Sequence, residues 1–106
     1  HIVGPATSQP NIRRRMKLSV VVPAFNESER LPPSLERAFG YFAAHHPDFE
    51  ILVIDDGSAD GTAEVVRQRF GDRPQLRVIA YSPNRGKGHA VRTGLRAATG
   101  ELVLFS

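Results

Sequence analysis

The stretch ILVIDDGSADGT at residues 51–62 decides how the rest of the chain is interpreted. Its first four residues are apolar and rich in β-branched side chains, which is typical of a short strand buried on both faces. Two adjacent carboxylates, Asp55 and Asp56, follow at once, and then a Gly-Ser pair that favours a turn. Adjacent carboxylates repel each other, so ending a strand with both carries a cost unless another group accepts them.

The same strand pattern occurs in three other segments, at residues 18–22, 76–80 and 102–105. None of the four segments alternates between apolar and polar residues, as a strand in a sheet with one wet face would. We expect Pro23 to end the first strand, because proline cannot donate to a β-ladder.

Three segments with helical periodicity separate these strands. Pro32 and Pro33 fit only the first turn of the first helix, and Pro47 ends it. Asp60 is the expected N-cap of the second helix, and Gly71 and Gly100 follow the second and third. The expected buried faces are Leu31, Leu35, Ala38, Phe39 and Phe42; then Ala63, Val66 and Phe70; then Ala90, Val91, Gly94, Leu95 and Ala98.

The order β-α-β-α-β-α-β predicts an α/β fold with a mostly parallel sheet and helices on both faces. The length of 106 residues allows one small domain, and the composition, 41% hydrophobic and 24% charged, is that of a globular protein. No apolar run approaches the roughly 20 residues of a membrane-spanning helix. The absence of cysteine excludes disulfides and thiolate metal sites.

Ligands of parallel sheets bind beyond the carboxyl ends of the strands, and three of these ends carry unusual residues. The first strand leads into PAFNE at 23–27, the second into Asp55 and Asp56, and the third into NRGKG at 84–88. The aspartates could accept hydrogen bonds from a base or a ribose, or they could simply shape a turn. Arg85 and Lys87, among glycines at the start of a helix, suit a diphosphate or form a flexible basic loop.

Two common phosphate-binding motifs are absent. The P-loop pattern does not occur, and the segment 86–91 has Val91 where the dinucleotide fingerprint needs its third glycine. The four histidines show no metal-ligand spacing, and His45 and His46 are expected at a helix end.

The motifs VVVPAFNE (20–27), VIDDGSADGT (53–62) and NRGKGHAVRTG (84–94) together resemble family 2 glycosyltransferases of GT-A fold. The resemblance covers residues 17–106, and the last motif is most similar to enzymes that move a sugar onto a polyprenyl (dolichyl-type) phosphate. It implies an inverting transfer of a hexose from a nucleotide diphosphate sugar, with UDP-glucose favoured and GDP-mannose next. The acceptor would be a polyprenyl phosphate at a membrane surface, with the protein in the cytoplasm or on the cytoplasmic face of a membrane.

The resemblance also implies roles for matching positions. Asp56 would bind the base and Asp55 would support it, and the remaining nucleotide-sugar-binding residues would be Pro23, Ala24, Asn26, Glu27, Arg85 and Lys87. The family's Asp-x-Asp motif, which holds Mg²⁺ or Mn²⁺, normally follows the fourth strand. We therefore expect the metal ligands and the catalytic residues downstream of Ser106, and a chain that is inactive alone and associates with itself.

Residues 1–16 have no periodicity and are interpreted as a flexible leader outside the core, and Arg13–15 as a solvated arm. Residues 17–106 would then form the nucleotide-sugar-binding part of the domain. Three alternatives stay open: a transferase with a polysaccharide acceptor, a regulatory domain similar to phosphoacceptor receivers, and a nucleic-acid module built on the arginine run. Receivers place their paired carboxylates after the first strand rather than the second, and no aromatic stacking face accompanies the arginines.

Overall fold

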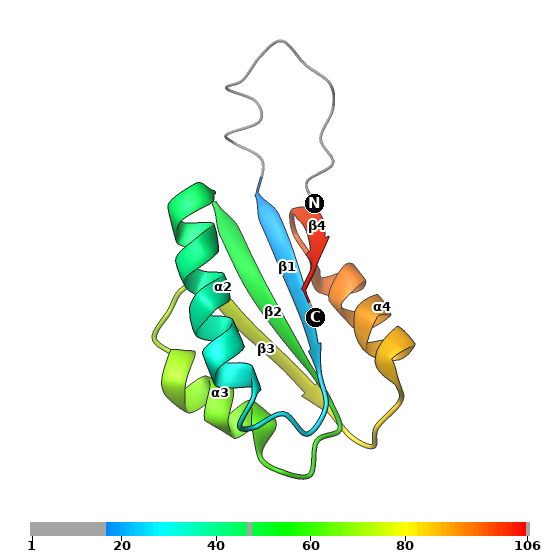
Figure 1. Cartoon of the computed structure of the whole chain (residues 1–106). Coiled ribbons are helices and arrows are strands. Elements are labelled where there is room, and N and C mark those ends of the chain that lie inside the picture. Colours follow the sequence, from blue (N-terminus) through cyan, green and yellow to red (C-terminus); the bar gives the residue numbers. More distant parts are fainter. Residues whose placement is uncertain (1–16, 47, 106) are drawn as a thin grey trace.

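A computed structural model describes residues 17–46 and 48–105 of the chain (Figure 1). Strands and helices alternate from the first element to the last, as the sequence predicts. The elements are β1 (Leu18–Ala24), α2 (Leu31–His45), β2 (Phe49–Asp56), α3 (Thr62–Phe70), β3 (Leu76–Tyr81), α4 (Lys87–Ala97) and β4 (Glu101–Leu104).

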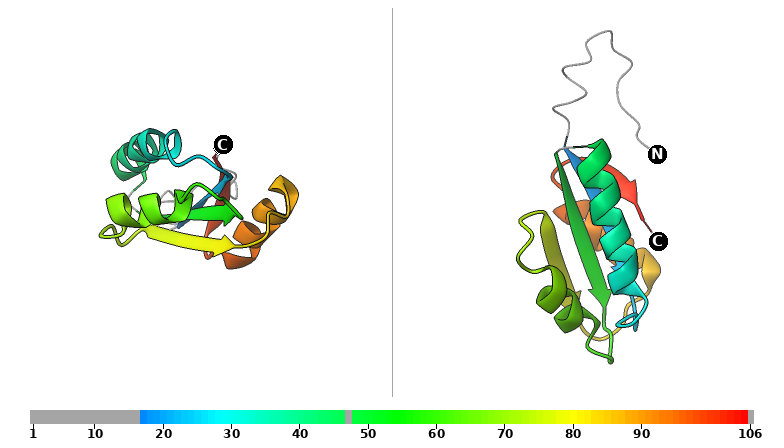
Figure 2. Two further views of the ribbon diagram at one scale, coloured as in Figure 1. Left: turned by 90° about the horizontal axis from the view of Figure 1, so that it is seen from below. Right: turned by 60° about the vertical axis from the view of Figure 1, so that its left-hand side comes forward.

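The four strands form one parallel sheet in the order β3-β2-β1-β4. Helices α2 and α3 lie on one face of this sheet and α4 lies on the other, which is clear when the molecule is seen from below (Figure 2). The predicted α/β class, with a parallel sheet and helices on both faces, is confirmed. Because all strands run the same way, the polar segments that follow β1, β2 and β3 meet at the carboxyl ends of the strands.

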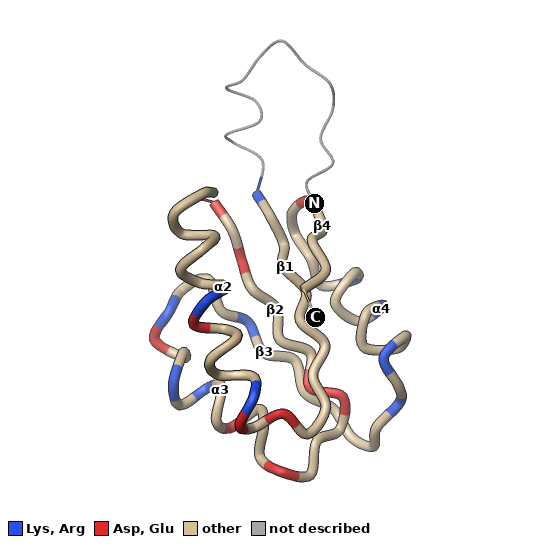
Figure 3. The backbone as a smooth tube through the Cα atoms, in the orientation of Figure 1, with Lys and Arg blue, Asp and Glu red and all other residues tan. Residues whose placement is uncertain are grey.

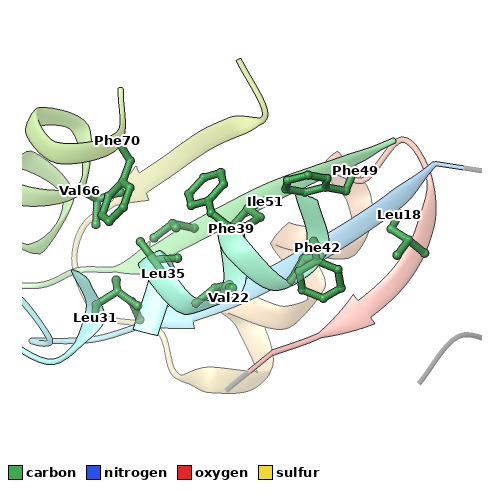
Figure 4. Close-up of a cluster of buried hydrophobic side chains, with 14 residues drawn as sticks. Leu18, Val22, Leu31, Leu35, Phe39, Phe42, Phe49, Ile51, Val66 and Phe70 are labelled. Atoms are coloured by element: carbon green, nitrogen blue, oxygen red, sulfur yellow. The ribbon is translucent and has the colours of Figure 1, made fainter. Parts of the chain in front are cut away.

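The core has one layer on each side of the sheet. The larger layer joins alternate residues of β1 and β2 to the apolar faces of α2 and α3, and four phenylalanines, Phe39, Phe42, Phe49 and Phe70, lie within it (Figure 4). The smaller layer lies under α4 and contains Val21, Leu52, Ile54 and Ala90. The predicted buried faces of the first two helices are confirmed, since every residue named for them is buried.

Strand β1 continues through Pro23 to Ala24, so the prediction that Pro23 ends it is wrong. The carbonyl of Val21 accepts a hydrogen bond from the N–H of Phe105, so the backbone N–H and C=O groups of Val21 point toward β4. Two residues later, the backbone nitrogen of Pro23 points to the same side. Pairing with β4 ends at Val21, opposite Leu104. The backbone N–H that Pro23 lacks would therefore point to a place where no residue of β4 is paired with it.

Helix α4 differs from the prediction at Leu95, which is 47% exposed rather than on the buried face, and the helix ends at Ala97, with Ala98 as its cap. Only Ala90 and Gly94 of this helix are buried. Gly94 lies directly on Val21, where a Cβ would overlap the valine side chain, so the helix is docked through its smallest residues. The close packing that Gly94 predicts is confirmed.

Strand β3 is less buried than predicted, because it forms one edge of the sheet and Arg77 and Ala80 are exposed. Asp60 is not the N-cap of α3; Gly61 takes that position, with a φ of 77°. Gly71 follows α3, and His45 and His46 end α2, as predicted. The interpretations of residues 1–16, of Arg13–15 and of Pro47 lie outside the described residues. No helix in 17–46 or 48–105 has the length and apolar character needed to cross a membrane.

Candidate functional site

The carboxylate of Asp56 is the centre of the strand-end cluster. It ends β2, is only 3% exposed, and accepts four hydrogen bonds, two on each oxygen. Oδ1 accepts from the hydroxyl of Tyr81 at 2.6 Å and from the N–H of Arg85 at 2.9 Å. Oδ2 accepts from Nδ2 of Asn84 at 2.8 Å and from the N–H of Gly86 at 2.9 Å. Asp56 therefore fixes the whole segment that leads into α4.

Asp56 is held in its charged form. Burial by itself raises the pKa of this carboxyl, but the hydrogen bonds from Tyr81, Arg85 and Gly86 outweigh burial and lower it below its usual range. The neighbouring His89 also lowers the pKa of Asp56, through charge. The four hydrogen bonds that Asp56 accepts, together called the Asp56 clamp, are consequently present at neutral pH. They are lost only as the pH falls through this lowered pKa.

The clamp places the N-terminus of α4 on a groove of about 910 Å³. The groove runs from the end of β1 along the first turns of α2 to Phe105, and Gly86 and Lys87 lie on its other side. Figure 3 shows acidic positions gathered where β1 and β2 end and basic positions around the start of α4. A helix N-terminus beside a lysine is a favourable place for an anion.

Five of the eight predicted site residues line this groove: Pro23, Ala24, Glu27, Asp56 and Lys87. The other three do not line it. Arg85 is exposed and contributes its backbone N–H to Asp56, while Asn26 and Asp55 are occupied in joining loops.

Asn26 joins the loop after β1 to the loop after β2. Its backbone is left-handed, with a φ of 51°, which asparagine tolerates better than most residues. Its side-chain oxygen accepts from the N–H of Ala59 at 2.8 Å, and its own N–H donates to Oγ of Ser58 at 2.8 Å. Asp55 holds the same turn by accepting from the N–H of Ser58 at 3.1 Å. These contacts fix the loops after β1 and β2 to each other beside the groove.

Asp60 and Thr62 extend this connection. The hydroxyl of Thr62 accepts from the N–H of Glu27 at 3.0 Å, and Asp60 Oδ2 accepts from the N–H of Ser28 at 3.1 Å. Asp60 Oδ1 also accepts from the N–H and the hydroxyl of Thr62. The hydrogen bond from the Thr62 side chain lowers the pKa of Asp60. Asp60 thus binds the first turn of α3 although it does not occupy the cap position.

Sequence reasoning missed two residues of the cluster, Tyr81 and Asn84. Tyr81 lies directly opposite Asp56 in the register of β2 and β3, and Asn84 donates to both the carboxylate and the carbonyl of Asp56. Both stand in or beside the third strand end, so the expected meeting of the strand ends was the signal that could have found them.

The described residues contain no group of three or more His, Cys, Asp or Glu side chains that could hold a metal ion. The adjacent aspartates do not supply one, because Asp56 is fully hydrogen-bonded and Asp55 holds the turn at Ser58. The Mg²⁺ or Mn²⁺ implied by the resemblance therefore has no site in the described part of the chain. The expectation that its ligands lie elsewhere stays a prediction.

Comparison with known proteins agrees with the motifs. A dolichyl-phosphate beta-glucosyltransferase of Trichomonas vaginalis is 44% identical over 90 residues, which is 80% of this chain and 27% of that protein. The chain thus spans less than a third of the length of the curated relatives it matches.

Solved structures show the same fold. A mannosyltransferase of Pyrobaculum calidifontis, in complex with GDP-Man and Mn²⁺, is 33% identical with a TM-score of 0.64, over 81% of this chain and 25% of that one. TarS 1–349 of S. aureus, in complex with UDP, is 30% identical with a TM-score of 0.71, over 85% and 27%. These neighbours are GT-A glycosyltransferases. The profile described as "Glycosyl transferase family 2" matches residues 19–106, and the chain belongs to that family.

Proposed function

We propose that the chain is the nucleotide-sugar-binding part of an enzyme that transfers a hexose to a polyprenyl phosphate with inversion. UDP-glucose is the favoured donor and GDP-mannose the next. Relatives named as dolichyl-phosphate beta-glucosyltransferases support the glucosyl donor and the lipid acceptor. An undecaprenyl-phosphate 4-deoxy-4-formamido-L-arabinose transferase of Photorhabdus laumondii, 36% identical, supports the polyprenyl-phosphate acceptor but not the glucosyl donor. Family membership favours this interpretation over the regulatory domain.

The observation that carries the proposal is the Asp56 clamp at the edge of the groove. Three donors of the loop 84–86 hold it against Asp56, a fourth donor on β3 binds the same carboxylate, and this presents Lys87 and the free N–H groups of α4 to the groove. A diphosphate there would meet one full positive charge and the positive end of a helix dipole. Arg85, exposed beside them, would add a second charge once its side chain turned inward.

The base and ribose would lie against the end of β1. Pro23 and Ala24 offer an apolar surface there, and Glu27 a carboxylate that is paired with Arg30 at 2.8 Å. A base N–H that reached Asp56 would have to share an oxygen that already accepts two hydrogen bonds. Direct recognition of the base by Asp56 is therefore the least favourable of the roles that the resemblance implies.

The transfer itself is an in-line displacement. An oxygen of the acceptor phosphate would attack the anomeric carbon, a new carbon–oxygen bond would form, and the bond to the nucleoside diphosphate would break. The diphosphate leaves with the electron pair of that bond, so groups that stabilise its growing charge lower the barrier. Lys87 and the N-terminus of α4 are the described groups in position to do so. A divalent ion bound by the whole enzyme would supply further charge to the same leaving group.

The proposal is tested by titrating the isotope-labelled chain with UDP, GDP and inorganic diphosphate, each with and without Mn²⁺. We expect amide shifts at Ala24, Asp56 and Arg85 with one nucleoside diphosphate, and only weak shifts near Lys87 with diphosphate alone. Shifts that are the same for all three ligands would reject a base pocket. Because the described residues hold no metal cluster, Mn²⁺ alone should leave these amides unchanged.

A further inference from the structure

Tyr81 contacts the candidate site although it does not line the groove. It is the last residue of β3 and does not line the groove. Its hydroxyl nevertheless donates to Oδ1 of Asp56 at 2.6 Å, a length typical of a strong O–H···O⁻ hydrogen bond. Its ring stands edge-on to that of His89 in the first turn of α4, with ring centres 5.1 Å apart. One side chain thus touches both the centre of the clamp and the helix that the clamp positions.

We propose that Tyr81 is a positioning residue for nucleotide binding, acting through Asp56 to fix the loop 84–86 and the N-terminus of α4. The ligand of this site, a nucleoside diphosphate, is taken from the proposed function. The role of Tyr81 in holding the loop follows from contacts within the chain.

The argument begins with how the carboxylate is held. Two of its four donors, the N–H groups of Arg85 and Gly86, belong to the loop that is being positioned, and a third, Asn84, precedes them on the same loop. Tyr81 is the only one of the four donors that lies on a sheet strand. Without it, every remaining hydrogen bond of the carboxylate goes to the loop, and no residue of the neighbouring strand fixes the orientation of the Asp56 side chain.

The phenol is well suited to this task. Burial and the hydrogen bond to Asp56 both raise the pKa of Tyr81 above its usual range, so the hydroxyl keeps its proton and remains a donor across the physiological range. The residue is also half-buried at the margin of the smaller core layer. Removing only its oxygen leaves the apolar packing of the ring in place.

The test compares Tyr81→Phe with Tyr41→Phe, a matched control because Tyr41 is 58% exposed on α2 and lies outside the groove. In Tyr81→Phe we expect amide hydrogen exchange at Arg85 and Gly86 to accelerate about tenfold, the effect of losing one hydrogen bond to a charged group. The core amides of β2 should change far less. Unchanged exchange at Arg85 and Gly86, or equal acceleration throughout the chain, would overturn the proposal.

A second arm measures the affinity for UDP and, separately, for GDP. The Kd of the nucleotide that binds should rise about tenfold in Tyr81→Phe and stay constant in Tyr41→Phe. In an Asp56→Asn background the same change should have little further effect, because Tyr81 acts through that carboxylate. An equal Kd in Tyr81→Phe and wild type would overturn the proposal. If wild type binds neither nucleotide, the proposed function fails, while the exchange experiment still decides whether Tyr81 holds the loop.

Discussion

Besides Asp55 and Asp56, Glu50 is a buried carboxylate, and it lies at the end of the sheet opposite to the site. It is 4% exposed and accepts from Ser19 Oγ at 2.6 Å, from the N–H and hydroxyl of Thr99 at 2.9 Å, and from Arg77 at 3.1 Å. Burial raises the pKa of Glu50, but these hydrogen bonds outweigh it and lower the pKa to about 2. One side chain therefore joins β1, β2, β3 and the turn before β4.

The free energy of unfolding should depend on pH through the ionisation of Glu50. Its pKa is lowered on folding, so its contribution is fully present above the ordinary value of 4.5 and is lost as the pH falls toward about 2. Glu50→Gln places an amide donor among donors, and we expect it to lower the free energy of unfolding at pH 7 by on the order of 3 kcal/mol. Urea unfolding between pH 7 and pH 3 measures both effects. Glu36→Gln, in an exposed pair with Arg73, should cost less than about 1 kcal/mol, and an equal loss in both variants would refute this role of Glu50.

Gly57 and Gly61 form a matched pair at the site. Both have left-handed backbones, with φ of 73° and 77°, but a Cβ on Gly57 would overlap the backbone of Asn84, whereas nothing lies within 4 Å of one on Gly61. Gly61→Ala should cost only the strain of a left-handed alanine, about 1 kcal/mol. Gly57→Ala should cost more and also displace the loop 84–86. Amide spectra and nucleotide titration of both variants would show this, and normal binding by Gly57→Ala would contradict it.

At the scale of elements, the docking of α4 depends on a glycine. Gly94→Ala would overlap Val21 in the core, so we expect a loss of about 1–3 kcal/mol and faster amide exchange in α4. Gly40 is the opposite case, because it lies within α2 with nothing within 4 Å of an added Cβ. Gly40→Ala should stabilise the chain by about 0.5–1 kcal/mol through helix propensity. Thermal unfolding of the two variants should therefore move in opposite directions, and a shift in the same direction would reject the packing argument.

The elements themselves could be predicted because their signals are local. Apolar runs located all four strands, and the i, i+4, i+7 spacing located the buried face of α2. Strand ends were harder, since whether Pro23 breaks β1 depends on which neighbour its missing donor would face. The exposure of Leu95 likewise depends on how closely α4 approaches the sheet at Gly94. Both are facts of tertiary packing that periodicity does not contain.

At the scale of the whole molecule, the parallel order of strands brings the candidate site together. This order predicted that the segments after β1, β2 and β3 would meet, and Asp56, at the end of β2, accepts hydrogen bonds from the segment after β3. The role of Asp56 in binding the base stays a prediction. The sequence did not reveal which residues of these segments line the groove and which hold the loops together. Asn26 and Asp55 are used to join loops, and Tyr81 enters because the register sets it opposite Asp56. Those roles depend on pairing between distant segments.

The exposed edge at β4 predicts that the 106-residue chain associates with itself. Strand β4 is one of the two edge strands of the described sheet, the other being β3, and Leu104 on β4 is 51% exposed. An unpaired strand edge with an apolar side chain favours pairing with a second copy, most simply about a two-fold axis that sets the two β4 strands side by side.

We expect the mass measured by light scattering to rise with protein concentration, and Leu104→Lys to suppress the rise, because the charge would have to be desolvated at the new contact. Tyr41→Lys provides the control, since Tyr41 is also exposed but lies on α2. A monomeric mass at every concentration would exclude self-association. Equal suppression by both lysines would show that net charge, and not the β4 edge, governs it.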